Sequence, residues 1–135
     1  MTLNRKRDYE SGVDVSSVFD GRGAGPSDTE IKERDGNQCA RDGSIHDLHV
    51  HHRVPRSGGR DERASNRITL CAFCHRWVHH NPQAATGEGW VVLRTSDPAL
   101  IPVNHVLWPA GPVLLTDEHA GIEIWQGQAH PHEYP

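Results

Sequence analysis

The sequence predicts an α+β fold, and three observations lead to this prediction. Residues 48–80 read as a strand, a polar loop, a second extended segment and a helix. A helix start signal precedes this region, and short apolar segments of the β type follow it. We therefore expect a central strand–loop–strand–helix unit, a short N-terminal helix and a small antiparallel β extension at the C-terminal side.

Local signals place the elements of the first half. Ser27 and Glu30 have the spacing of a capping box, which predicts a short helix over residues 28–35 with Gly36 at its C′ position. Residues 48–54 alternate weakly and contain β-branched side chains, so they predict a strand that ends before Pro55. A polar loop over 56–65 and an extended segment over 66–70 follow. The helix expected over residues 72–80 is ended by Asn81-Pro82.

The second half is predicted to be rich in β structure. Candidate strands are 90–93, 103–108, 113–115 and 122–125, and Gly and Pro residues separate them. The chain therefore divides into a flexible tail over residues 1–26, a region over 27–82 that carries the chemistry, and a β-rich extension over 83–135.

Composition limits the classes of protein that this chain can belong to. The chain has 135 residues and a net charge of −4, about the length of one domain. No apolar run approaches about 18 residues, which argues against a membrane span. Residues 39–80 hold seven Arg and four acids, so an acidic chain has a basic centre that suits a nucleic-acid partner. Three Cys cannot form a closed set of disulfides, and no secretory signal is seen, so we expect a cytoplasmic protein.

The cysteines predict a structural zinc site. Cys71 and Cys74 form a C-x2-C pair, and such a turn can present two thiolates to one zinc ion. Cys39 supplies a third ligand, and Asp42 stands where a fourth is expected, with His46 as its rival. The alternative is three buried reduced cysteines without a metal ion.

The histidines predict a second metal site. His75 and His79 are four residues apart and share one face of a helix. His51 and His52 are adjacent on a strand, so they point to opposite faces. One of them can bind a cation while the other faces a substrate, and three imidazoles leave coordination positions open. The alternative is a set of solvated surface histidines.

Together, these residues resemble an HNH endonuclease over about residues 28–82. The resemblance lies in a composite motif, namely a His pair, a Pro, a Gly-Gly pair, an Asn, and then Cys-x2-Cys-His at the start of a helix. The motif spans Leu48 to Gly59 and Ser65 to His79. The resemblance implies the ββα-metal fold, also called the His-Me finger, in which a hairpin and a helix surround one divalent ion.

The resemblance also implies a role for each residue of the motif. His52 matches the general base that takes a proton from the attacking water, and Asn66 matches the Asn that fixes the hairpin and orients the base. His51, His75 and His79 match metal ligands. The reaction implied is hydrolysis of DNA phosphodiester bonds with one divalent cation (Mg, Mn, Ni or Zn), leaving 5′-phosphate and 3′-hydroxyl ends.

The partner implied is DNA, most simply double-stranded DNA. The arginines expected to contact it are Arg53, Arg56, Arg60, Arg67 and Arg76. Two positions depart from the family pattern: Asp42 replaces the usual fourth Cys, and Arg53 stands where an apolar residue is commoner. Further partners to consider are a second copy of the chain, in a homodimer, and a phage or host protein. If the chain is phage-encoded, the expected location is the cytoplasm of the bacterial host cell.

The acidic segment after the helix also resembles C-terminal extensions of HNH proteins from actinobacteria and their phages. We interpret this segment as a packing module or a protein-contact surface.

Two other functions remain open from the sequence. The first is a non-catalytic zinc module that binds nucleic acid or protein, in which His52 and Asn66 would be dispensable. The second is a metallohydrolase that acts on another phosphoester, because three His and a base suit phosphoesters in general. RNA is not separated from DNA by these observations.

Overall fold

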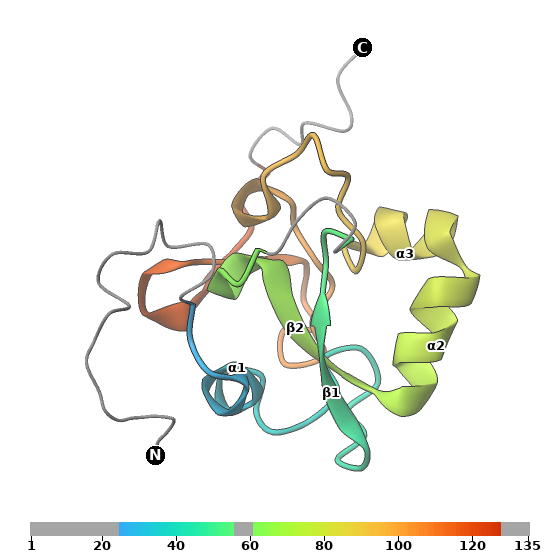
Figure 1. The fold of residues 1–135 in the computed structure, drawn as a ribbon. Helices are drawn as coiled ribbons and strands as arrows, with labels where there is room; N and C mark the ends of the chain where they lie inside the picture. The colour runs from blue at the N-terminus through green and yellow to red at the C-terminus, as the bar shows by residue number, and fades with distance from the viewer. Residues whose placement is uncertain (1–24, 56–60, 128–135) are drawn as a thin grey trace.

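The computed structural model describes residues 25–55 and 61–127, and it confirms the α+β prediction. Three α-helices are accompanied by two antiparallel sheets of two strands each and by short 3-10 helices (Figure 1). The elements in chain order are α1 (Asp28–Arg34), β1 (Leu48–His52), η3 (Ala64–Asn66), β2 (Arg67–Cys71), α2 (Ala72–His80), α3 (Pro82–Glu88), η4 (Pro98–Leu100), β3 (Val113–Leu115), η5 (Glu118–Ala120) and β4 (Ile122–Ile124).

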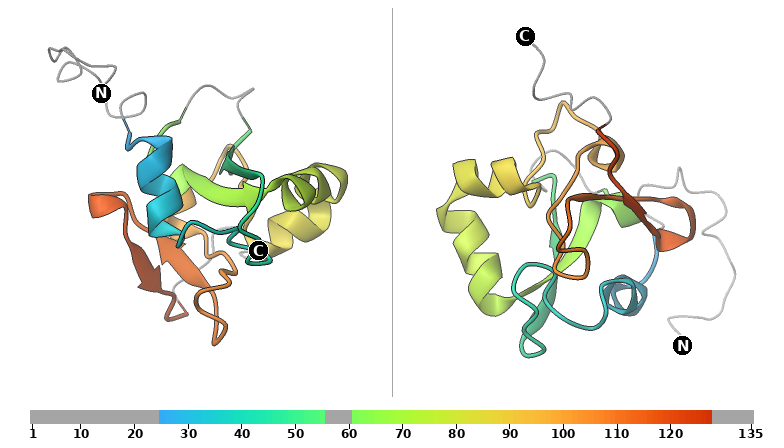
Figure 2. Two further views of the ribbon diagram at one scale, coloured as in Figure 1. Left: turned by 90° about the horizontal axis from the view of Figure 1, so that it is seen from below. Right: turned by 180° about the vertical axis from the view of Figure 1, so that it is seen from behind.

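The β1–β2 pair lies at the centre of the molecule. Helices α2 and α3 lie on one side of it, and α1 lies on the other side together with the β3–β4 pair (Figures 1 and 2). Helix α2 contacts both central strands, so side chains from β1 and α2 can meet in the angle between them. The β1–β2 pair and helix α2 thus form the ββα unit that the resemblance implies.

Helix α1 begins and ends as its sequence predicts. The Ser27 hydroxyl accepts a hydrogen bond from the Glu30 amide at 3.1 Å, and the Glu30 carboxylate accepts one from the Ser27 amide at 2.8 Å. Gly36 follows the helix with a φ of +79°, a conformation that costs glycine little. Ile31 is buried and anchors the helix to the core.

The central hairpin fixes which residues face each other. Leu48 pairs with Cys71 at one end of the strand pair, and His52 pairs with Arg67 at the other end. Strand β2 is buried along its whole length and continues directly into α2. The cysteines therefore gather at one end of the hairpin, and the general-base candidate lies at the other.

Two of the strand predictions after residue 83 are wrong. No strand forms over 90–93, because the Trp90 amide caps α3 through the carbonyl of Ala85, and the Val92 amide donates to the carbonyl of Arg53. Residues 103–108 contribute only an isolated bridge between Val103 and Val113. The strands predicted near 113–115 and 122–125 are present as β3 and β4.

Helix α3 was not expected, because Pro82 was interpreted only as the end of the preceding helix. Proline stops a helix that precedes it, but its fixed φ suits the first turn of a new one. Pro82 occupies that first turn here. Gly89 ends the helix with a φ of +92° and packs closely against Pro102 and Val103.

One hydrophobic core spans the predicted boundary at residue 82. Ile68, Leu70 and Val78 pack in the same cluster as Trp90 and Val103. The remaining buried members of that cluster are Cys39, Ala40, Cys71, Cys74, Ala85, Val113 and Leu115. The residues after 82 therefore share a core with the hairpin and α2.

The predicted tail falls outside the described residues except for Gly25 and Pro26. Among the residues that the structure describes, no helix has the length and apolar character needed to cross a bilayer.

Candidate metal centre and hairpin site

Three histidines meet between β1 and α2. His51, His75 and His79 each offer one ring nitrogen, and these nitrogens lie within 4.8 Å of one another. The ring centroids of His75 and His79, one helical turn apart on α2, are 4.8 Å apart, and those of His51 and His75 are 5.2 Å apart. His51 is buried, His75 is half-buried and His79 is exposed, so the group opens toward solvent.

His51 has only one nitrogen left for a cation. Its Nε2 lies 2.8 Å from the carbonyl oxygen of Trp90. Because a carbonyl only accepts, this nitrogen carries the hydrogen, and the lone pair of the neutral ring is on Nδ1. A backbone carbonyl that orients a histidine in this way is a common feature around protein metal sites.

The histidines of the group are suited to a cation at neutral pH. Burial, together with the nearby His75 and His79, lowers the pKa of His51 to about 4. Burial and the neighbouring His79 and His49 also lower the pKa of His75. Both rings are therefore neutral near pH 7, which is the form that binds metal ions.

His52 points away from this group, as adjacent strand residues must. Its Nε2 lies 3.1 Å from Oε1 of Glu62, and the two side chains are 17% and 14% exposed. The imidazole is thus accessible to a small reactant yet held by one defined partner.

Asn66 joins the two ends of the segment that connects the central strands. Its Oδ1 accepts a hydrogen bond from the Val54 amide at 2.9 Å, and its Nδ2 donates to the Asp61 carbonyl at 2.8 Å. Asn66 is 1% exposed, so it contacts backbone and not solvent. Its position matches the hairpin-fixing role that the family resemblance implies.

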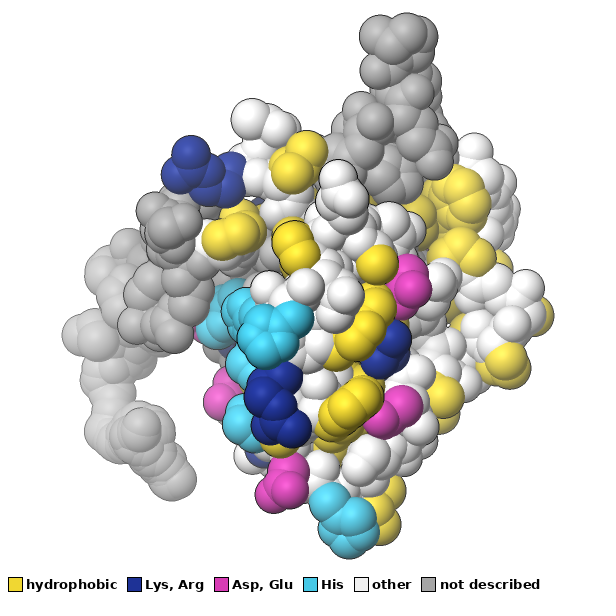
Figure 3. Space-filling view, turned by 90° about the vertical axis from the view of Figure 1, so that its right-hand side faces the viewer, with side chains coloured by type: hydrophobic (Ala, Val, Ile, Leu, Met, Phe, Trp, Pro, Cys, Tyr) yellow, Lys and Arg dark blue, Asp and Glu magenta, His cyan; other side chains and the backbone are white. Residues whose placement is uncertain are grey.

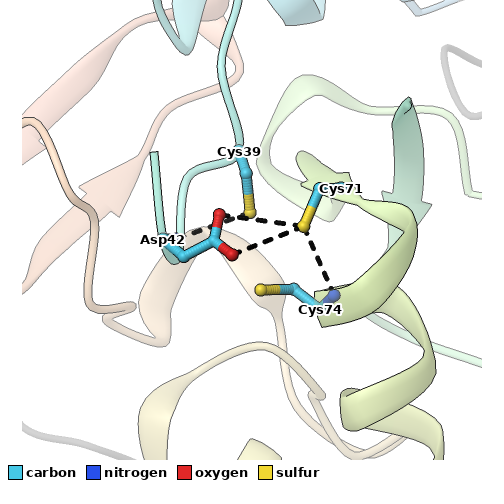
Figure 4. Close-up of side chains that lie close together, drawn as sticks. All are labelled: Cys39, Asp42, Cys71 and Cys74. Atoms are coloured by element: carbon cyan, nitrogen blue, oxygen red, sulfur yellow. Dashed lines mark hydrogen bonds between the residues drawn. The ribbon is translucent and has the colours of Figure 1, made fainter. Parts of the chain in front are cut away.

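A second group, formed by three cysteines and an aspartate, lies at the other end of the hairpin (Figure 4). Cys39, Asp42, Cys71 and Cys74 each offer one ligand atom within 4.8 Å of the others. His46, the rival fourth ligand, is exposed and is not a member of this group.

The surroundings of the sulfur atoms suit a bound cation. Backbone amides of Arg41 and Asp42 point at the Cys39 sulfur from 3.4 and 3.5 Å, and the Cys74 amide points at the Cys71 sulfur from 3.4 Å. Burial raises the pKa values of the Cys39 and Cys74 thiols. A coordinated cation deprotonates such thiols outright, and the amide hydrogens then stabilise the thiolates. Three sulfurs and a carboxylate oxygen are a donor set that zinc accepts.

Arg53 was predicted to contact DNA, and this prediction is wrong. The side chain is 1% exposed. Its guanidinium donates to four backbone carbonyls, those of Gly89 (2.9 Å), Ser65 (2.8 Å), Pro98 (3.1 Å) and Ile101 (2.8 Å). Burial and the nearby Arg34 lower the pKa of Arg53 to about 9, which leaves it charged at neutral pH. Arg53 therefore binds the extension to the hairpin.

Arg67 was also expected to contact DNA, and it too is buried, with 2% exposure. It donates to the backbone carbonyls of Pro26 and Glu62, and it pairs with the Glu62 carboxylate at 3.4 Å. Neither Arg53 nor Arg67 can reach a phosphate without leaving these partners.

The other predicted phosphate contacts have different locations. Arg76 is exposed on α2, directly after His75 and three residues before His79. Seen from the side of α2 and α3, several histidine side chains gather in a patch, and one basic group lies directly beside it (Figure 3). Arg56 and Arg60 lie outside the described residues.

Sequence reasoning missed two groups that hold the histidines. The Trp90 carbonyl is a backbone atom 39 positions from His51, so no side-chain motif announces it. Glu62 lies in a polar loop among other charged residues, and only its proximity to the motif Asn could have drawn attention to it.

The comparisons with known proteins agree with this geometry. The HNH endonuclease family model matches residues 37–81, which include both central strands, α2 and both candidate metal groups. No curated protein and no solved structure matches the chain. Over residues 37–81, the chain is therefore similar to the HNH endonuclease family.

Proposed function

We propose that this protein is a metal-dependent DNA endonuclease that hydrolyses phosphodiester bonds. One observation carries the proposal. The ligand atoms of His51, His75 and His79 converge within 4.8 Å, while the adjacent His52 is held on the opposite face of the same strand. A cation site and a base on either side of one strand are the two groups that such a hydrolysis needs.

In the proposed mechanism, His52 is the general base. Its imidazole takes a proton from a water molecule, and the resulting hydroxide attacks the phosphorus atom. Asn66 holds the two ends of the connecting segment and so keeps the hairpin in shape around His52. His51, His75 and His79 would hold one divalent cation, which supplies stabilisation for charge on the scissile phosphate and the leaving 3′ oxygen. The products are 5′-phosphate and 3′-hydroxyl ends.

We assign a structural role to the second group. Cys39, Asp42, Cys71 and Cys74 would hold a zinc ion that ties the loop after α1 to the junction of β2 and α2. The substrate is proposed to be double-stranded DNA, and the exposed Arg76 beside the histidine group supports a polyanion.

Relaxation of supercoiled plasmid tests the proposal. Wild type, His52→Ala, His75→Ala and His80→Ala are purified in parallel and assayed in EDTA and then in Mg²⁺, Mn²⁺, Ni²⁺ and Zn²⁺. His80 is exposed at the end of α2 and is outside the three-histidine group, so it is the matched control. We expect cleavage by wild type and His80→Ala with a divalent ion, and losses of about 100-fold or more in the other two variants.

The ratio of nicked to linear product reports whether one or both strands are cut. Equal cleavage by wild type and His52→Ala would contradict the assignment of the base. A folded wild type that binds plasmid and cleaves it with none of the ions would favour the non-catalytic zinc module, for which the cysteine group is the supporting observation.

A further inference from the structure

We propose that Glu62 is a positioning residue for His52, and that it selects the nitrogen with which His52 acts as a base. This inference rests on the proposed nuclease function. Nothing in the HNH motif of this sequence points to Glu62, because the residue lies in the polar segment between the Gly-Gly pair and the motif Asn.

The contact between the two side chains is direct and sheltered. Glu62 Oε1 lies 3.1 Å from His52 Nε2, and neither side chain is more than 17% exposed. A pair in such a position is screened by water and salt much less than an exposed surface pair. The contact therefore restricts the orientation of the imidazole ring.

The surrounding structure holds Glu62 in place from two directions. The Arg67 guanidinium, which is 3% exposed, lies 3.4 Å from Glu62 Oε1 and also donates to the Glu62 carbonyl at 3.1 Å. On the other side, the carbonyl of the preceding residue, Asp61, accepts the hydrogen bond from Asn66. The carboxylate thus reaches His52 from a fixed backbone, and an oriented base requires such a partner.

The chemistry of a carboxylate decides what this contact does. An ionised carboxylate only accepts hydrogen bonds, so His52 Nε2 must carry a hydrogen, and the lone pair of the neutral ring is on Nδ1. In the reaction, an O–H bond of water breaks and its proton moves to Nδ1. The hydroxide forms a bond to phosphorus as the bond to the 3′ oxygen breaks, and solvent returns a proton to that oxygen. The Glu62 carboxylate stays ionised and stabilises the imidazolium that forms.

The first arm of the test measures cleavage kinetics in Glu62→Gln, in His52→Ala and in the double variant, with Glu33→Ala as the matched control. Glu33 is an exposed glutamate on α1. Glu62→Gln keeps the shape of the side chain but removes its charge. We expect kcat to fall about 10- to 100-fold with KM nearly unchanged, and Glu33→Ala to match wild type. Glu62→Asp should recover part of the loss.

The double variant separates positioning from a structural role. If Glu62 acts through His52, then adding Glu62→Gln to His52→Ala changes the residual rate less than about twofold. An equal fall in both backgrounds, or a rise in KM alone, would overturn the proposal because Glu62 would then act on folding or on DNA binding.

The second arm does not depend on cleavage. Long-range ¹H–¹⁵N NMR spectra at about pH 9 report which nitrogen of a neutral histidine carries the hydrogen, and His52→Ala identifies the His52 signals. We expect the Nε2–H form alone in wild type and a mixture of both forms in Glu62→Ala. A mixture in wild type would overturn the proposal. If wild type shows only the Nε2–H form but does not cleave DNA, the contact between Glu62 and His52 is supported and the proposed nuclease activity is contradicted.

Discussion

At the scale of single residues, the two nitrogens of His51 have separate tasks. Nε2 donates to the Trp90 carbonyl, which fixes the ring, and Nδ1 remains available to a cation. Burial disfavours the charged form of this ring, so its pKa lies at about 4. The residue is therefore held in the form that coordinates a metal before any metal arrives.

The depressed pKa of His51 predicts how stability varies with pH. The ring titrates near pH 6.5 in the unfolded chain and at about 4 in the folded protein. Between these values the unfolded chain binds more protons, so the free energy of unfolding falls as the pH falls through this window, by up to about 3 kcal/mol. His51→Asn can still donate to Trp90 and does not titrate.

Denaturant unfolding in metal-free buffer between about pH 4.5 and 7 measures this contribution. We expect the wild-type curve to decline more steeply toward low pH than the His51→Asn curve. Parallel curves would mean that His51 titrates normally in the folded protein.

Single residues also show where sequence reasoning succeeds and where it fails. Spacing along a helix was enough to place His75 and His79 together, and alternation along a strand was enough to separate His51 from His52, because both depend on local geometry. The choice of His51 as the third member of the group came from the family resemblance. Arg53 and Arg67 were wrongly placed on the DNA-binding surface. Their acceptors are mostly backbone carbonyls of distant segments, and a sequence gives no sign of which carbonyls will lack a partner.

At the scale of elements, the junction of β2 and α2 combines two roles in one residue. Cys71 ends the strand, and its sulfur accepts the Cys74 amide as the N-cap of the helix. The same sulfur lies 3.5 Å from the Asp42 carboxylate, on the loop that follows α1. The start of α2, and with it the position of His75, is therefore coupled to the cysteine group.

This coupling predicts the effect of changing Asp42. Asp42→Cys supplies a fourth thiolate, so we expect tighter zinc binding and a higher Tm. Asp42→Ala leaves three ligands and should weaken zinc binding at least about tenfold. Competition with a chromophoric chelator and thermal unfolding measure both effects. His46→Ala is the control and should behave as wild type, whereas weakened zinc binding in that variant would make His46 a ligand.

The elements differ in how well their sequences predict them. Helices α1 and α2 have local start and stop signals, and both lie within one residue of their predicted bounds. Segment 90–93 is apolar and β-branched, yet it forms no strand, because its backbone amides serve the α3 cap and Arg53. Helix α3 was missed because a Pro has opposite meanings at the end of one helix and at the start of another.

At the scale of the whole molecule, the HNH region and the extension depend on each other. Trp90, Val103, Val113 and Leu115 complete the core around β2 and α2. Three of the four carbonyls that accept from Arg53 also lie after residue 82, on Gly89, Pro98 and Ile101. Without these residues a buried guanidinium would lose most of its partners, which is strongly unfavourable.

We therefore expect a fragment of residues 1–82 to be unfolded, even with zinc present. In the full chain, Arg53→Met should lower the free energy of unfolding by at least about 3 kcal/mol, because it removes all four hydrogen bonds from the guanidinium to buried carbonyls. Arg76→Ala, at an exposed position on α2, should change it by less than about 0.5 kcal/mol. Circular dichroism of the fragment and denaturant unfolding of the variants measure these effects. A cooperatively folded fragment would contradict the interdependence.

The way in which Arg53 is bound has a consequence for sequence divergence. Its acceptors are main-chain oxygens, which every amino acid supplies, so the side chains at positions 98 and 101 can be exchanged without removing these hydrogen bonds. Gly89 is the exception, because its φ of +92° and its close packing against Pro102 leave no room for a side chain. Arg53 itself cannot be exchanged in this way, because its guanidinium donates all four hydrogen bonds. Among relatives, we expect an arginine directly after the histidine pair to accompany an extension of this kind, even where the extension's own sequence has changed beyond recognition.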